Sequence, residues 1–208
     1  MKQAQSSISI NSLYCAIDNK VILSDINFNL NSGQSITITG PNGVGKTLLL
    51  NTIVGFKSIF KGKISINKIN LSNDPSNRQE HIGYYGHKAS IHTGLTVMET
   101  IEYWKAYYSS DANTSELIKF WDLPNKTVES CSEGQRKRLA LVRLSLMNRN
   151  IWILDEPTTN LDFIGKKKFL ELHTSHLRAG GLSIITSHEP AQVKGHKIIN
   201  LERHSGKN

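Results

Sequence analysis

The fold of this 208-residue chain is decided by the stretch Gly40-Pro41-Asn42-Gly43-Val44-Gly45-Lys46-Thr47. It matches the phosphate-binding loop, in which four residues separate a glycine from Gly-Lys-Thr or Gly-Lys-Ser. The alternating residues 34–39 before it predict a strand, and the apolar residues 48–50 after it begin a helix. Glycines let backbone N–H groups curve around a phosphate, and the dipole of the following helix favours the same anion. The stretch therefore predicts a site for a nucleoside triphosphate.

Four side chains supply the chemistry that such a site needs. Lys46 can reach the β- and γ-phosphates as a point charge, and the hydroxyl of Thr47 can bind Mg²⁺. Asp155 and Glu156 follow the continuous apolar run 151–154, which is typical of a strand buried on both faces. Ligands of open α/β sheets bind at the carboxyl ends of strands. We therefore expect Asp155 to hold Mg²⁺ and Glu156 to polarise the attacking water.

Composition limits the classes of protein that need to be considered. The length predicts one α/β domain, alone or with an inserted subdomain. No apolar run approaches the roughly 18 residues that cross a bilayer, and the polar residues 1–7 lack the core of a signal peptide. Cys15 and Cys131 fit no metal-ligand spacing, which favours a reducing compartment. The net charge of +8 selects no partner, because basic clusters such as 136–138 are usually solvated helix faces.

The order of predicted elements gives the architecture. Strands are expected at 7–14, 21–30, 34–39, 64–66, 81–85, 151–154, 182–186 and 197–201, and helices at 46–54, 133–147 and 163–177. The polar segment 70–80 is expected to be a loop, and the helical pattern of 95–123 is broken at 109–113. We therefore expect an α/β P-loop NTPase with a parallel core sheet and an N-terminal antiparallel β-layer. A helical subdomain at approximately 88–145 would be inserted within a single domain spanning 1–208.

A second anion site is indicated by Ser132-Glu133-Gly134-Gln135, which precedes a strong helix. A serine hydroxyl, backbone N–H groups and the helix dipole can bind a phosphate together. The alternative is ordinary N-capping by Ser132, with Glu133 favourable in the first turn. Because the chain already carries a phosphate loop, the two motifs would be two half-sites.

The motif order resembles that of the ATP-binding-cassette (ABC) ATPases along nearly the whole chain. The phosphate loop is followed by a Gln-loop-like region, residues 132–135, Asp155-Glu156, Asn160-Leu161-Asp162 and His188. The resemblance implies that two copies pack head to tail around two ATPs. Ser132 and Gly134 of one copy, in the motif that ends at Gln135, would then contact the ATP of the other, and Asp162 would cross the interface. Glu156 would be the general base, and His188 would contact the γ-phosphate.

Further stretches narrow the resemblance to the haem-exporter ATPases of cytochrome c maturation, the CcmA family. They are Tyr84-Tyr85-Gly86-His87, Gly94-Leu95-Thr96 with Glu99, residues 152–157, and Ser187-His188-Glu189-Pro190. His87 stands where most ABC ATPases have a glutamine, which implies a role near Mg²⁺. The resemblance also implies integral membrane partners of the CcmB and CcmC type and a peripheral location on the cytoplasmic face of the inner membrane.

The membrane partners would contact residues 87–108. The candidate apolar contacts there are Ile91, Leu95, Val97 and Met98. The alternative is that these residues only pack the core of the helical insert.

Several departures from the family pattern affect these expectations. Cys131 replaces the usual signature leucine, and Glu133 replaces a glycine, which brings a negative charge near a phosphate site. Ile17 lies where many members stack an aromatic ring on adenine, and Tyr14 is the nearby candidate.

Other ABC classes remain open alternatives. One is a single-domain subunit of the lipoprotein-export or cell-division type. Another is a DNA-repair ATPase, but the chain has no long heptad run, so nucleic acid is not the expected partner.

Overall fold

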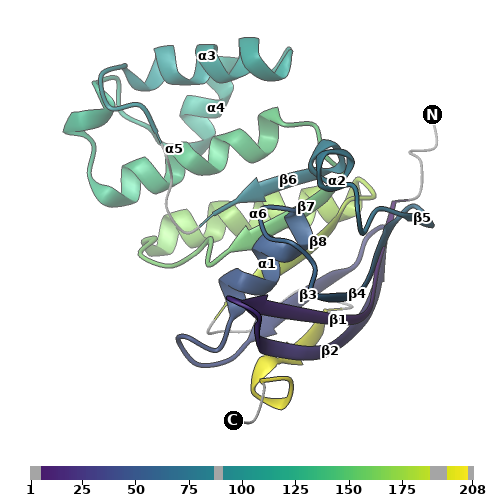
Figure 1. Cartoon of the computed structure of the whole chain (residues 1–208). Helices are drawn as coiled ribbons and strands as arrows, with labels where there is room; N and C mark the ends of the chain where they lie inside the picture. The colour runs from purple at the N-terminus through teal and green to yellow at the C-terminus, as the bar shows by residue number, and fades with distance from the viewer. Residues whose placement is uncertain (1–5, 87–90, 188–195, 206–208) are drawn as a thin grey trace.

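The structure is a computed structural model that describes residues 6–86, 91–187 and 196–205 (Figure 1). His87 and His188 therefore lie outside the described residues. The strands are β1 (Ser7–Ile17), β2 (Lys20–Asn31), β3 (Ser35–Thr39), β4 (Lys61–Ile66), β5 (Ile69–Asn70), β6 (Ile82–Tyr85), β7 (Ile151–Asp155), β8 (Leu182–Thr186) and β9 (Lys197–Asn200). The helices are α1 (Lys46–Val54), α2 (Pro75–His81), α3 (Val97–Tyr108), α4 (Thr114–Trp121), α5 (Glu133–Leu146) and α6 (Phe163–Arg178), with short 3-10 helices at Val128–Ser130 and Leu201–Arg203.

Two sheets form the framework. The five-stranded sheet has the order β6-β7-β8-β3-β9, and its pairings are all parallel. Its strands β7 and β8 are buried along their whole length, as their continuous apolar runs require. The four-stranded sheet has the order β2-β1-β4-β5, is antiparallel, and alternates between buried and exposed residues on β2. The predicted parallel core and N-terminal antiparallel layer are confirmed.

Helix α1 packs between the two sheets, against β7 of one and β1 of the other (Figure 1). Its residues Leu49, Leu50 and Ile53 are completely buried in the larger core cluster. The phosphate loop is thereby fixed between β3 and a helix that is held on both sides.

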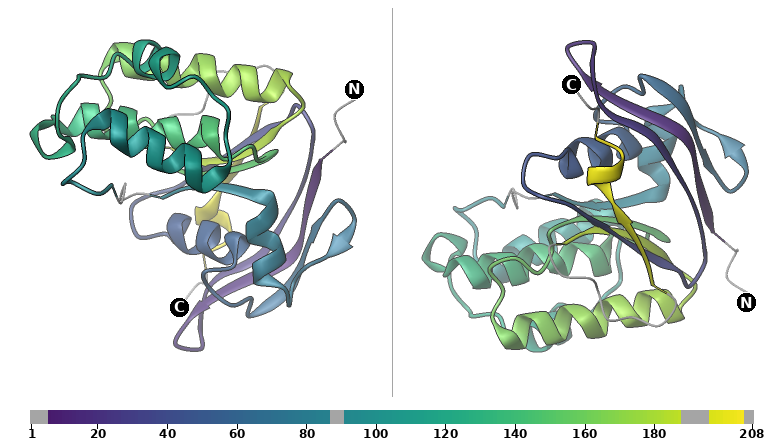
Figure 2. Two further views of the ribbon diagram at one scale, coloured as in Figure 1. Left: turned by 90° about the horizontal axis from the view of Figure 1, so that it is seen from above. Right: turned by 90° about the horizontal axis from the view of Figure 1, so that it is seen from below.

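Figure 2 shows helices α3, α4 and α5 grouped together. They contribute Trp104, Trp121 and Leu139 to a second core, which also includes residues of β6, β7, β8 and α6. The three helices lie across the parallel sheet from the antiparallel layer, and α3 and α4 both pack on α5. The break between α3 and α4 falls at Ser109, in the left-handed region at φ +50°, as the sequence break at 109–113 predicts. The boundaries 88–145 of the insert and the single domain spanning 1–208 stay predictions.

The expectation of a loop over 70–80 is wrong, because α2 begins at Pro75. Asp74 caps it by accepting a hydrogen bond from the backbone N–H of Asn77 at 3.0 Å, and proline suits the first helical position. The Asp-Pro pair was the available signal, but the segment lacks apolar periodicity. Its buried residue is Arg78, a type that hydrophobic patterns do not count.

Two further observations concern composition. Cys15 and Cys131 are both free and buried. Among the residues that the structure describes, no helix combines the length and apolar composition that crossing a membrane requires.

Candidate nucleotide-binding site

The phosphate loop connects β3 to α1 and depends on its glycines. Gly40, Gly43 and Gly45 have φ values of +147°, +80° and +108°, where an L side chain is strained. A Cβ on Gly45 would also lie 3.2 Å from the side chain of Leu23. Gly45 is the N-cap of α1 and offers no side-chain acceptor, and the first turn of α1 holds no acidic residue. The first N–H groups of α1 thus lack a side-chain cap, which suits an anionic ligand.

Lys46 is held over its own loop although its side chain is only 7% exposed. Its ammonium donates to the carbonyl oxygen of Gly40 at 2.9 Å and of Pro41 at 3.5 Å. It also lies 3.6 Å from Oε1 of Glu156. The buried positive charge is therefore kept beside the loop that would receive a phosphate.

The carboxylate of Asp155, at the end of β7, is fixed by two hydroxyl groups. Oγ1 of Thr47 donates to Oδ2 at 2.8 Å, and Oγ1 of Thr186 donates to Oδ1 at 2.7 Å. Thr186 ends β8, directly opposite Asp155 in the parallel register. Thr186 is not among the residues predicted for the site, although its position at the end of a predicted buried strand was a usable signal.

The donor set at Asp155 fits a hard divalent cation. Its carboxylate is 2% exposed, and no lysine or arginine of the described chain lies within ion-pair distance. A buried carboxylate without a basic partner is costly, whereas Mg²⁺ prefers oxygen ligands such as this carboxylate and the hydroxyl of Thr47. The described residues hold no cluster of three or more histidine, cysteine or acidic side chains able to bind a metal.

Glu156 leaves the strand with φ +48°, an uncommon value for a residue with a side chain. Its backbone N–H donates to Oγ1 of Thr186 at 2.8 Å, so one threonine positions both acidic residues. Its Oε2 accepts a hydrogen bond from Oγ1 of Thr159 at 3.3 Å. The turn therefore places Glu156 beside the ammonium of Lys46, while Asp155 accepts the hydrogen bond from Thr47.

Tyr84, from the neighbouring strand β6, is also coupled to this site. Burial, together with the charge of Asp155, raises the pKa of Tyr84 to about 12. The phenol is therefore neutral at physiological pH, and it donates to Oδ1 of Asn51 on α1 at 3.1 Å.

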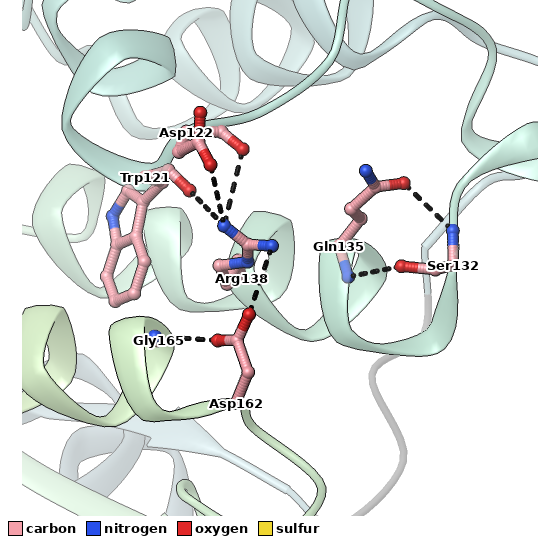
Figure 3. Close-up of polar contacts among 7 residues, drawn as sticks. All are labelled: Trp121, Asp122, Ser132, Gln135, Arg138, Asp162 and Gly165. Carbon is pink, nitrogen blue, oxygen red and sulfur yellow. Dashed lines mark hydrogen bonds and ion pairs between the residues drawn. The ribbon is translucent and has the colours of Figure 1, made fainter.

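The motif 132–135 begins α5 with a capping box (Figure 3). Oγ of Ser132 accepts from the backbone N–H of Gln135 at 3.2 Å, and Oε1 of Gln135 accepts from the backbone N–H of Ser132 at 3.0 Å. Among the described residues, no hydrogen bond or ion pair joins this motif to residues 40–47. Glu133 instead accepts from Nδ2 of Asn160 at 3.0 Å. The structure shows the N-capping, and the role of the motif as a second half-site stays a prediction.

Asp162 has two partners inside its own chain (Figure 3). Its Oδ1 accepts from the backbone N–H of Gly165, at the start of α6, at 2.7 Å, and its Oδ2 lies 3.7 Å from Nη2 of Arg138. Arg138 also donates to the carbonyl oxygen of Trp121 at 3.2 Å and lies 3.4 Å from Oδ2 of Asp122. Arg138 is 9% exposed, so assigning the whole cluster 136–138 to a solvated face is wrong.

The candidate contact residues of the helical insert divide into two groups. Val97 is 1% exposed and belongs to the second core, so it is wrong as a surface contact. Ile91 is half-buried and packs against the same core, and Leu95 is half-buried. Met98 is 46% exposed and remains available.

The candidate adenine contacts lie on β1. Ile17 is 50% exposed. The ammonium of Lys61 lies over the ring of Tyr14, 5.2 Å from the ring centroid. Neither arrangement tests the predicted stacking.

Comparisons with known proteins identify relatives over nearly the full length. Residues 23–159 match the family model described as ABC transporter. The cytochrome c biogenesis ATP-binding export protein CcmA of Histophilus somni is 35% identical over an alignment of 206 positions that covers 95% of this chain and 94% of the relative. The protein of the same description from Escherichia coli K12 is 32% identical over 198 residues, with coverages of 91% and 92%.

Solved structures agree on the fold. An ABC transporter ATP-binding protein from Pyrococcus furiosus has a TM-score of 0.83 at 25% identity, and the match covers 96% of this chain and 100% of the other. A dimeric ATP-binding cassette bound to ADP and Pi has a TM-score of 0.73 at 22% identity, with 88% of each chain covered.

Proposed function

This chain belongs to the ABC transporter family as an ATP-hydrolysing subunit, and we propose that it drives a haem exporter of cytochrome c maturation. The observation that carries the catalytic part is the network in which Thr47 and Thr186 fix Asp155 while Thr186 also positions Glu156. The similarity to CcmA proteins over more than nine-tenths of the chain supports the choice of pathway.

Each residue of the network has a role in the proposed reaction. Residues 40–47 bind the triphosphate through backbone N–H groups, and Lys46 moves from its carbonyl partners to the phosphate oxygens. Thr47 and Asp155 would hold Mg²⁺, which would neutralise negative charge on the phosphates. Glu156 accepts a proton from the attacking water once Lys46 has moved to the phosphate oxygens and no longer pairs with it. His87 and His188, outside the described residues, complete the site near Mg²⁺ and the γ-phosphate.

A second copy of the chain supplies the missing half of the site. Ser132, Gly134 and Gln135 of one copy contact the ATP on the phosphate loop of the other, and Asp162 lies at the interface. The dimeric cassette with ADP and Pi supports this arrangement through its shared fold. The internal contacts of Asp162 with α6 and Arg138 fix the position of the segment that meets the partner.

Closure of this dimer around ATP moves integral membrane subunits of the CcmB and CcmC type. These subunits keep the chain on the cytoplasmic face of the inner membrane. A hollow of about 510 Å³ between the end of α1, β6 and the ends of α3 and α5 supports a contact there. Phe56, Tyr84, Tyr107 and Arg143 line it. Tyr107 on the rim of the hollow is 71% exposed and lies within the predicted contact region 87–108.

Purification of the tagged chain from its own membranes, with detection of bound haem, tests the pathway. We expect copurification of CcmB- and CcmC-type subunits with haem. Recovery of a lipoprotein-export or cell-division permease would end the haem assignment and leave the ATPase assignment in place. Salt-dependent DNA binding by the purified chain would instead favour the repair class, because phosphate contacts weaken steeply with salt.

A further inference from the structure

A second hollow, of about 390 Å³, opens between the loop that follows α1 and the start of α2. Polar side chains from both segments line it, namely Lys57, Ser58, Ser72, Asn73 and Arg78. None of them belongs to the nucleotide site. The hollow shares Phe56 with the larger one beside α3, so the two are neighbours on the surface.

Arg78 lies at the base of this hollow with little of its hydrogen-bonding capacity used. The residue is 2% exposed, and its Nη1 makes one long hydrogen bond, 3.4 Å to the carbonyl oxygen of Ser72. Its Nε is buried without a hydrogen-bond partner. No carboxylate of the described chain lies within 4.0 Å of the guanidinium, since Asp74 is engaged in capping α2. A buried guanidinium without an ion-pair partner is costly, and burial lowers the pKa of Arg78, although the charge of Asp74 opposes that shift.

The chain makes room for this guanidinium. Gly55 has φ +102°, and a Cβ there would lie 3.2 Å from Nη2 of Arg78 and 2.7 Å from Cβ of Pro75. Lys57 adds a second positive charge at the exposed rim and makes no ion pair within the described chain. The hydroxyl of Ser58 and the amide of Asn73 add possible donors. The hydroxyl of Ser72 is already engaged, because it donates to Oδ1 of Asn70 at 2.6 Å. Planar guanidinium groups match phosphate oxygens, and lysine binds phosphate as a point charge.

We propose that this hollow is a separate anion site, distinct from residues 40–47 and 132–135, which binds a phosphate group between Arg78 and Lys57. A phosphate ester or inorganic phosphate fits the donors, and the hollow is large enough for a lipid headgroup. The site is independent of the phosphate loop and of the proposed haem pathway. Free phosphate and a membrane lipid are the two sources of the same chemistry, and the experiment below separates them.

Titration of the full ¹⁵N-labelled chain with inorganic phosphate, at constant ionic strength and with saturating Mg-ADP on the phosphate loop, tests the site. We expect a saturable shift of the Arg78 Nε–H resonance and of the backbone resonances of residues 55–58. Lys57→Gln should weaken this binding about tenfold, as loss of one charge-assisted contact predicts. Lys63→Gln, which removes an exposed lysine of β4 outside the hollow, is the matched control and should change nothing.

Arg78→Gln should abolish the response, but the Lys57 variant keeps the test valid if loss of Arg78 impairs folding. Sedimentation with phosphatidic acid vesicles, compared with uncharged detergent micelles, shows whether the bound phosphate group belongs to a lipid or is free. Vesicle binding that Lys57→Gln weakens and Lys63→Gln does not assigns the site to lipid phosphate, and a response to inorganic phosphate alone assigns it to free phosphate. The proposal is overturned if neither probe gives a saturable response, or if Lys57→Gln and Lys63→Gln behave alike.

Discussion

The ammonium of Lys46 lies 3.6 Å from the carboxylate of Glu156, which pairs the phosphate-loop cation with the proposed general base. The two side chains are only 7% and 13% exposed, so water screens this attraction poorly. ATP must compete for Lys46, and its arrival frees Glu156 from that cation. Binding and activation of the base are therefore linked.

Glu156→Gln should keep or tighten ATP binding, because it removes the competitor for Lys46, and should lower the hydrolysis rate about 10²- to 10⁴-fold, the usual contribution of a general base. The amide keeps the size of the side chain and removes the proton acceptor. Trapped ATP should hold the chain as a dimer, measurable by light scattering with and without ATP. Glu171→Gln, at an exposed position of α6, is the matched control. Normal turnover in the Glu156 variant would remove Glu156 from the mechanism.

Thr186→Val should impair the site without touching either acidic residue. It removes the hydroxyl that donates to Oδ1 of Asp155 and accepts from the backbone N–H of Glu156. That oxygen and that N–H, both poorly solvated, are then left without this partner. We expect a loss of about 1–3 kcal/mol in the free energy of unfolding and a higher Mg²⁺ concentration for half-maximal ATPase activity. Thr186→Ser restores the hydroxyl and should recover most of both values. If valine leaves the Mg²⁺ dependence unchanged, Thr186 does not position Asp155.

The site divides into parts that the sequence predicts and parts that it does not. Residues 40–47 and Asp155 were predictable because contiguous motifs and apolar runs specify local structure. Thr186 was missed because its role depends on β8 lying beside β7, and register between distant strands is not a local property. Arg138 was missed for a related reason, since a basic residue on an amphipathic helix is buried only when partners such as Asp162 come from other segments.

Acidic conditions should destabilise the chain through two histidines of α6. Burial lowers the pKa of His173 to about 4, assisted by His176 and His196 nearby, and burial also lowers the pKa of His176 to about 4. Both are depressed from about 6.5 in the unfolded chain, so stability is complete above pH 6.5 and falls as pH decreases toward 4. The expected loss at pH 5 is about 2 kcal/mol per histidine, measurable by urea unfolding at pH 7.5 and 5.

His176→Phe is the variant that checks this assignment. His176 stacks on Trp152 with ring centroids 3.7 Å apart, and phenylalanine keeps an aromatic ring there without a titrating group. The variant should lose about half of the pH dependence, whatever its stability at pH 7.5. An unchanged difference between pH 7.5 and 5 would show that other groups cause the acid sensitivity.

Glu133 should restrain closure of the dimer, and its effect has two separable causes. Its negative charge lies in the motif proposed to meet the partner's ATP, and its Oε1 is tied to Nδ2 of Asn160. Glu133→Gly removes both and should lower the KM for ATP by about fivefold or less, the range of a partly exposed charge. Asn160→Gly removes only this hydrogen bond, and glycine tolerates the left-handed φ of +60° at that position.

The outcomes separate the two causes of restrained closure. Charge repulsion is the cause if only the Glu133 variant lowers the KM, and the hydrogen bond is the cause if both variants lower it equally. An ATPase KM that neither variant changes would mean that Glu133 lies away from the second phosphate site, and the half-site assigned to residues 132–135 would have to be abandoned.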